Sequence, residues 1–302
     1  MRCLLVLGVL LAAAIGGALV LGSGPTSAAH RTTLLKEDVL PGGAVRREWS
    51  NGATFVGDAD AKVTFTENAE GEATAAAVTV PGVASAEALA AKAAAYRRSA
   101  RSPEKDMRAA GMPLFPRSLD TVVRPGARRA PFLARTYGTP NVIYDSGCVV
   151  LDRSDAYWRG CFTRKGTASS DCCAFYLADS SQASGHAKAG GHWLVSGSGE
   201  QRYATGTSIV QWSPGSDINS SSCTETSVGL SGYGVTLSRG YTRCPKLIHI
   251  DVTSTKFTAG WQGCKGSTTS PGVAEAAFTK VPSGKSPTLV YSIAAYTLPW
   301  SC

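Results

Sequence analysis

The chain has 302 residues, of which 30 are Lys or Arg and 22 are Asp or Glu, so its formal net charge is +8. That length is enough for one large domain, or for a small domain and a medium one. The basic balance does not indicate a nucleic-acid partner, because aromatic side chains do not interleave with the cations.

The first 29 residues have the order of features found in signal peptides. The cation Arg2 precedes an apolar run from Leu4 to Gly22, and small residues follow it. This order predicts cleavage after Ala28 or Ala29. An uncleaved membrane anchor is the alternative, because a run of about 19 apolar residues can just span a bilayer. Either way the later residues are expected outside the cytoplasm, and the cleaved form is a secreted, extracellular protein without stable membrane insertion.

Residues 30–111 are predicted to form a small α+β unit. Three short runs alternate as strands do and are separated by turn residues. They are Ala53–Gly57, Lys62–Thr66 and Ala73–Val80. A helix capped by Ser85 is expected over residues 84–100. A second helix begins at Pro103, directly after the capping residue Ser102.

The charge becomes strongly basic between residues 92 and 135, which hold eleven Lys and Arg. A solvated helix face that runs into a linker explains this, and attraction to an anionic envelope surface is the alternative. Several prolines within residues 112–140 indicate that this part is a basic linker. A protease could cut at the dibasic pair Arg128–Arg129, which makes residues 30–111 a candidate pro-segment.

Residues 141–302 are predicted to form a disulfide-rich, all-β domain, an antiparallel sandwich or barrel. Seven runs rich in β-branched and aromatic residues are bounded by turn residues and show no helical period. They are 141–151, 174–178, 203–212, 226–237, 246–252, 273–278 and 289–298. The Gly-rich stretch 185–199 is predicted to be a surface loop, because it is too long for a hairpin turn.

All cysteines beyond the signal peptide fall in this domain, and an even set in an exported chain predicts disulfide bonds. They are Cys148, Cys161, Cys172, Cys173, Cys223, Cys244, Cys264 and Cys302. Eight cysteines allow 105 pairings, so the connectivity stays open. The sequence has no C-x-x-C spacing, and His186 with His192 makes only a weak metal site. We therefore predict no metal and no other cofactor.

The commonest catalytic motifs are missing from the sequence, which contains neither H-E-x-x-H nor G-x-S-x-G. In the run 247–253, His249 and Asp251 share one strand face and are our candidates for a general base and its partner. An exposed polar sheet face is the alternative explanation for the same alternation. Glu200 and Glu225 are a second candidate acid pair.

Aromatic residues give the best indication of binding. Exposed rings beside Gly, Ser or Gln are of the kind on which sugars and peptides stack. The candidate ligand-binding residues are Trp193, Trp212, Trp261 and Tyr233. Core packing is the alternative role for each of them.

These features together predict a secreted binding module. Its disulfide-stabilised β domain is expected to bind an extracellular or cell-envelope ligand, most simply a polysaccharide. One alternative is a secreted hydrolase with an N-terminal pro-segment. The other is a secreted toxin or inhibitor that acts on a protein partner.

Overall fold

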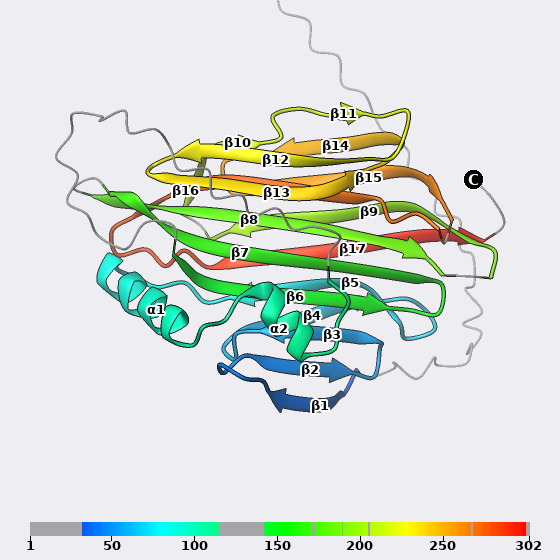
Figure 1. Cartoon of the computed structure of the whole chain (residues 1–302), viewed down its shortest axis with the longest axis horizontal. Coiled ribbons are helices and arrows are strands. Elements are labelled where there is room, and N and C mark those ends of the chain that lie inside the picture. The colour runs from blue at the N-terminus through cyan, green and yellow to red at the C-terminus, as the bar shows by residue number, and fades with distance from the viewer. Residues whose placement is uncertain are drawn as a thin grey trace, which may run out of the picture. The chain divides into compact units, whose positions relative to one another are not determined.

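The protein is an antiparallel β-sandwich that carries a β-hairpin and two helices on one of its sheets (Figure 1). The computed structural model describes residues 32–114, 142–170, 173–188, 190–204, 206–266 and 268–299. The contacts group the chain from Thr32 to Cys302 into one compact unit. The predicted class of the second part, a disulfide-bonded antiparallel sandwich, is confirmed.

Sheet A has eight strands in the order β1-β2-β3-β6-β7-β8-β16-β10. Their bounds are β1 Leu34–Val39, β2 Val45–Trp49, β3 Ala53–Gly57, β6 Ile143–Asp152, β7 Ala156–Ser170, β8 Ala174–Ala187, β16 Gly272–Pro282 and β10 Ser208–Ser213. Sheet B has seven strands in the order β11-β14-β15-β9-β17-β5-β4. Their bounds are β11 Ile218–Asn219, β14 Lys246–Val252, β15 Lys256–Lys265, β9 His192–Tyr203, β17 Leu289–Pro299, β5 Ala73–Val80 and β4 Lys62–Glu67.

Large aromatic side chains fill the space between the two sheets, and small residues in the facing strands leave room for them. Phe162 of sheet A contacts Tyr291 of sheet B, with ring centroids 5.5 Å apart. Trp158 is fully buried, and its Nε1 donates to the carbonyl oxygen of Ser198 at 3.3 Å. A Cβ atom at Gly197 would lie 2.2 Å from the Trp158 ring. Glycine is therefore the residue that fits opposite this indole.

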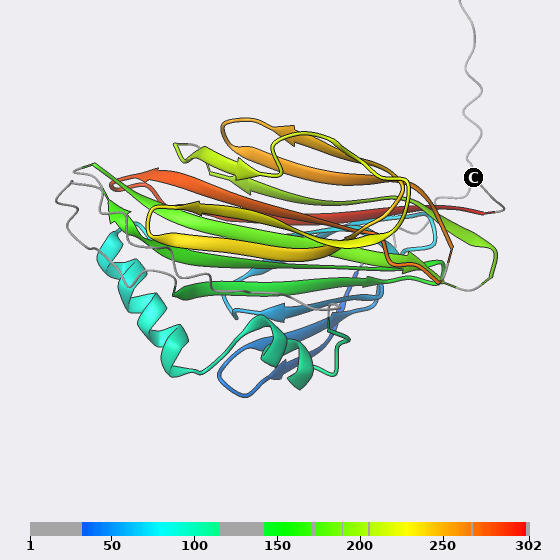
Figure 2. The same ribbon diagram turned by 45° about the horizontal axis from the view of Figure 1, so that its top comes forward.

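Helices α1 (Ala86–Arg98) and α2 (Pro103–Ala109) lie beside β6, as the two views in Figure 1 and Figure 2 show. Ser85 and Ser102 cap them as predicted, because each side-chain oxygen accepts a hydrogen bond from the backbone N–H three residues later. Leu89 of α1 is buried in a cluster with residues of sheet A. Met107 of α2 packs on the Cys148–Cys161 disulfide.

The hairpin of β12 (Thr224–Gly232) and β13 (Val235–Arg243) packs on β8 and β16. It turns at Tyr233 and Gly234, which both have positive φ (50° and 80°), as two-residue hairpin turns of type I′ require. The Tyr233 ring stacks on Tyr176 of β8 with centroids 4.3 Å apart. It also meets Phe278 of β16 edge-on. The ring at the turn thus fixes the hairpin to sheet A.

The strands and helices predicted within residues 30–111 are present, but they do not form a separate unit. β3 pairs with β6 in sheet A, and β5 pairs with β17 in sheet B. Phe55 and Val78 are buried in the same core cluster as the later strands. Charge and cysteine content change along the chain, but this change does not coincide with a boundary between the sheets. Most of the predicted linker lies outside the described residues.

The Gly-rich stretch 185–199 is not the surface loop that the sequence predicts. β8 continues to Ala187 and β9 begins at His192, so most of the stretch is strand. A Cβ atom at Gly185 would lie 2.0 Å from the carbonyl oxygen of Tyr157. The glycines in this stretch therefore allow close packing within and between strands.

Candidate functional site

His249 and Asp251 point to the same side of β14, as predicted, while Ile248 is buried on the other side. They do not pair with each other. Nδ1 of His249 lies 3.2 Å from Oδ2 of Asp217, and Asp251 forms an ion pair with Lys256. The predicted His249–Asp251 pair is therefore wrong, and Asp217 is the carboxylate that orients the imidazole.

Asp217 comes directly before β11, the strand that pairs with β14. Its Oδ1 accepts the backbone N–H of Ile250 at 2.7 Å. This bond, with the bond to His249, lowers the pKa of Asp217. A carboxylate at Nδ1 fixes the orientation and tautomer of an imidazole. The pair was not visible in the sequence, because its two residues are 32 positions apart.

The four predicted aromatic binding residues are spread over the molecule. Trp193 is 36% exposed on β9 of sheet B, and Trp212 is 41% exposed on β10 at the edge of sheet A. Tyr233 packs at the turn of the hairpin. Trp261 is 0% exposed, and its Nε1 donates to the carbonyl oxygen of Cys244 at 3.2 Å. A buried indole offers no face to a ligand, so the prediction for Trp261 is wrong and its role is core packing.

Disulfide bonds are confirmed in the described part of the chain. Cys148–Cys161 joins β6 and β7 at residues that are directly opposite in the register. Cys223–Cys244 closes the open end of the β12–β13 hairpin. Cys173 and Cys264 are also disulfide-bonded. The remaining two predicted residues, Cys172 and Cys302, lie outside the described residues.

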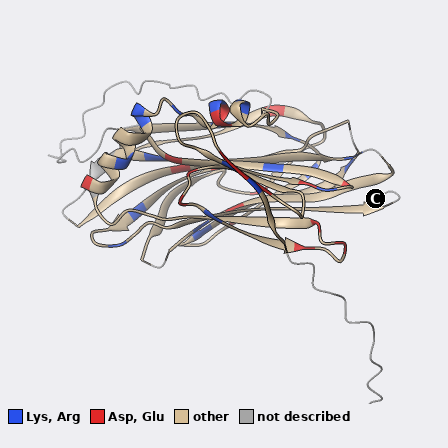
Figure 3. Cartoon of the chain, turned by 90° about the horizontal axis from the view of Figure 1, so that it is seen from below, with Lys and Arg blue, Asp and Glu red and all other residues tan. Residues whose placement is uncertain are grey.

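The described part of the basic segment contains both paired and exposed cations, and Figure 3 marks the Lys and Arg positions of the helices in blue. Lys92 forms an ion pair with Asp145 at 3.0 Å, and Arg101 forms one with Asp106 at 2.9 Å. Exposed cations of the helices include Arg97, Arg98 and Arg108. Residues 115–135 lie outside the described residues. Attraction to an anionic surface stays a prediction.

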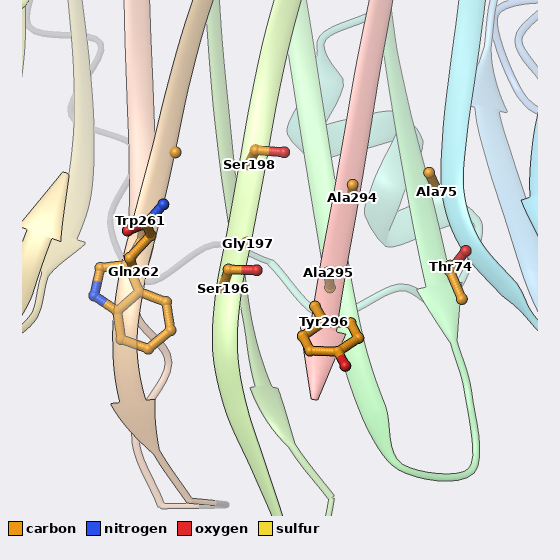
Figure 4. Close-up of a pocket in the computed structure, with 11 residues that line it drawn as sticks. Thr74, Ala75, Ser196, Gly197, Ser198, Trp261, Gln262, Ala294, Ala295 and Tyr296 are labelled. Atoms are coloured by element: carbon orange, nitrogen blue, oxygen red, sulfur yellow. The ribbon is translucent and has the colours of Figure 1, made fainter. Parts of the chain in front are cut away.

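The outer face of sheet B carries a groove with a volume of about 380 Å³ (Figure 4). It crosses β15, β9, β17 and β5, and we call it the transverse groove. Its lining residues with outward-facing positions are Gly260, Gln262, Ser196, Ser198, Ala294, Tyr296, Thr74 and Ala75. Gly197, Trp261 and Ala295 also border it, although they are buried between the sheets. Apart from the Tyr296 phenol, none of these side chains ionises.

The strand register places the smallest lining residues in one row across the sheet. Gly260 is opposite Ser198, Ser198 is opposite Ala294, and Ala294 is opposite Ala75. Strands in a sheet are about 4.8 Å apart, so this row is about 14 Å long. His249 is opposite Gly260 on the next strand. The row of the groove floor thus continues, beyond the lining residues, to His249, whose imidazole Asp217 orients.

One further row of residues forms a side of the transverse groove, and another row lies next to the floor on the opposite side. Gln262 is opposite Ser196, and Ser196 is opposite Tyr296. The residue Tyr296 is 59% exposed. Figure 4 shows the hydroxyl groups of Ser196 and Ser198 directed toward β17. In the row next to the floor on the opposite side, Glu200 is opposite both Thr258 and Ser292, which do not line the groove themselves. Glu225, the predicted acid partner of Glu200, lies on the hairpin instead, so that pair is not formed.

Beneath the groove, Glu275 of sheet A reaches the main chain of sheet B. Its Oε1 accepts the backbone N–H of Ala259, next to Gly260, at 2.7 Å. Its Oε2 lies at hydrogen-bond distance from Oγ of Ser181, 2.8 Å, and Nε2 of Gln201 donates to the same oxygen of Ser181. Burial raises the pKa of Glu275 to about 8. At neutral pH this carboxyl therefore joins the two sheets largely in its uncharged form.

Tyr296 and Gln262 are the largest outward-facing residues of the groove, and neither is a candidate from the sequence. The run 289–298 was predicted as a strand, and Tyr296 alternates in it with the buried Ala295. That period of two places Tyr296 and Ala294 on one face. The outward orientation of Tyr296 could thus be predicted from the sequence, but the identity of the neighbouring strands could not.

Among the described residues, no group of three or more His, Cys, Asp or Glu side chains is placed to hold a metal ion. No helix in these parts of the chain has the length and apolar character that a membrane span needs. No protein-family model matches the chain, and no curated protein matches its sequence. We therefore infer a function from the geometry of the transverse groove.

Proposed function

We propose that the chain is an extracellular binding protein that holds a neutral polysaccharide in the transverse groove. One observation carries this proposal: an uncharged floor of Gly260, Ser198, Ala294 and Ala75 runs beside the exposed ring of Tyr296. Hydroxyl groups and amides along such a floor offer hydrogen bonds to sugar hydroxyls. The Tyr296 ring offers a surface for the C–H face of a sugar.

The dimensions of the groove favour a polymer. Sites for small molecules are concave and surround most of the ligand, whereas this groove lies across four strands of an open sheet face. A row about 14 Å long accommodates several linked sugar units of a chain that continues past both ends. The groove therefore suits a segment of an extended chain better than a single sugar.

Disulfide bonds support an extracellular location for this activity. Bonds such as Cys148–Cys161 and Cys223–Cys244 persist mainly in oxidising compartments. The signal-peptide features of the first 29 residues lead to the same proposal.

Pelleting with insoluble cellulose, β-1,3-glucan and chitin tests the proposal. Tyr296→Ala should weaken binding to the polymer that retains the protein about 3- to 10-fold, because an aromatic contact contributes roughly 0.5–1.5 kcal/mol beyond its buried area. Trp212→Ala, which removes a similarly exposed ring from sheet A, is the matched control and should bind as the wild type does. Equal affinities for the two variants, or no retention of the wild type on any polymer, would contradict the proposal.

A hydrolase is the second candidate function, and the His249–Asp217 pair, in line with the groove floor and beyond its lining residues, favours it. An imidazole oriented by a carboxylate is suited to act as a general base. If the protein cleaves what it binds, soluble sugar should appear in the supernatant of the pelleting assay, and His249→Ala should stop its release. Retention without release would leave the binding protein as the better account.

A further inference from the structure

Glu200 lies in the row next to the floor of the transverse groove, on the side away from Tyr296, and both oxygens of its carboxylate are held in place. Oε2 accepts a hydrogen bond from Oγ1 of Thr258 at 3.0 Å, and Oε1 accepts one from Nη2 of Arg202 at 2.8 Å. The Glu200 side chain is 20% exposed, against 60% for Arg202. An ionised carboxylate has about four acceptor positions. Two bonds from the protein therefore orient the group and leave it able to accept more.

The charged residues of this face lie in rows parallel to the groove floor. Asp251, Thr258 and Glu200 form the row next to the floor, and Lys256 with Arg202 forms the row beyond it. The acids and cations pair across these rows, Asp251 with Lys256 and Glu200 with Arg202. The carboxylates therefore lie nearer to the groove floor than their cations do.

We propose that Glu200 determines the ligand class of the groove: it accepts hydrogen bonds from the hydroxyl groups of a neutral glycan and repels a glycan that carries carboxylates. This inference rests on the proposed binding function and refines it. Hydrogen bonds to an ionised acceptor are stronger than those between neutral groups, and like charges placed together disfavour a complex. The groove thus selects against anionic polymers although the whole chain has a net charge of +8.

A competition experiment separates the groove from the basic segment, because only a ligand that enters the groove displaces the glucan. The full-length secreted protein is retained on an insoluble β-glucan and displaced with a soluble β-gluco-hexaose, or with the same hexaose oxidised at C6 to uronic acids. For the wild type, the neutral hexaose should displace the protein at a concentration at least about tenfold lower than the oxidised one.

Glu200→Gln keeps a carbonyl acceptor and removes the charge. This variant should need about fivefold more neutral hexaose, because a charged acceptor is replaced by a neutral one. Its ratio between the two hexaoses should fall toward one. Glu225→Gln on the exposed part of β12 is the matched control, and it should keep the wild-type ratio.

The outcomes separate the inference from the proposed function. Equal displacement of the wild type by the two hexaoses, or an unchanged ratio in Glu200→Gln, would overturn the role of Glu200 while leaving binding in the groove intact. No retention of the wild type on cellulose, β-1,3-glucan or chitin would overturn both. A salt series on the wild type needs no variant: the ratio should fall as salt screens the partly exposed charge, and a ratio that is insensitive to salt would overturn the inference.

Discussion

Replacing Glu275 by Gln is expected to flatten the dependence of stability on pH. Burial raises the pKa of this carboxyl from 4.5 to about 8. Between these two values the folded state keeps a proton that the unfolded chain has released, so the free energy of unfolding falls as the pH rises. A difference of about 3.5 between the pKa values corresponds to about 5 kcal/mol, which is fully present below a pH of about 4.5 and is lost as the pH rises through about 8.

Glutamine preserves the local hydrogen bonds of this site. Its carbonyl can accept the backbone N–H of Ala259, and its amide can donate to Oγ of Ser181, the two partners of the Glu275 carboxyl. It has no proton to lose in this range of pH. The free energies of unfolding of Glu275→Gln and the wild type should therefore be similar at pH 5, and the variant should be the more stable by about 4 kcal/mol at pH 8.

Urea unfolding at pH 5, 6, 7 and 8, followed by the fluorescence of the buried tryptophans, measures this difference. Glu225→Gln, an exposed acid on the hairpin, is the control and should follow the wild-type profile. If the profiles of Glu275→Gln and the wild type run parallel across this range, the carboxyl does not keep its proton in the folded state and the reasoning is refuted.

Three further predictions concern the sandwich itself. Gly197→Ala should lower the free energy of unfolding by about 1–3 kcal/mol through overpacking, whereas Gly199→Ala, whose Cβ would have no neighbour closer than 3.5 Å, should have a much smaller effect; equal urea midpoints would contradict the packing described here. Trp261→Ala should cost about 3–5 kcal/mol as a large-to-small core substitution, and a thermal midpoint equal to that of the wild type would contradict its burial. Cleavage at Arg128–Arg129 should leave residues 32–114 bound to the rest of the chain in gel filtration, because β3 and β5 belong to the shared sheets; a freely eluting small fragment would contradict this.

Local signals in the sequence predicted the elements that local forces determine. Ser85 and Ser102 cap their helices because a hydroxyl three residues ahead of a free N–H is a short-range feature. Alternation of apolar and polar residues likewise gave β3, β4 and β5 within a residue or two of their ends. The face that each strand buries needed no knowledge of its partner.

The strands that the sequence did not predict depend on residues far away in the chain. β9 breaks the usual alternation with Gly197 and Gly199 on its buried side, and the reason for Gly197 is the Trp158 ring of the opposite sheet. The sheet to which each N-terminal strand belongs could not be predicted for the same reason. The N-terminal strands looked like a separate unit because their partners, β6 and β17, lie beyond the basic segment.

The candidate site was still less accessible from the sequence. The floor of the transverse groove combines residues of β5, β9, β15 and β17, which only the register of sheet B brings into one row. The sequence predicts exposed rings at three tryptophans and Tyr233, whereas the ring beside the floor is Tyr296. His249 was selected correctly as an outward-facing residue, but its partner Asp217 follows from strand pairing.

A crystal structure of the protein with a neutral gluco-hexaose, prepared with a glucan that retains the protein, tests the central claim most directly. We expect sugar density across Gly260, Ser198 and Ala294, with one ring against Tyr296 and hydroxyl groups within hydrogen-bond distance of Glu200. Density around Trp212 at the edge of sheet A, with an empty transverse groove, would contradict it.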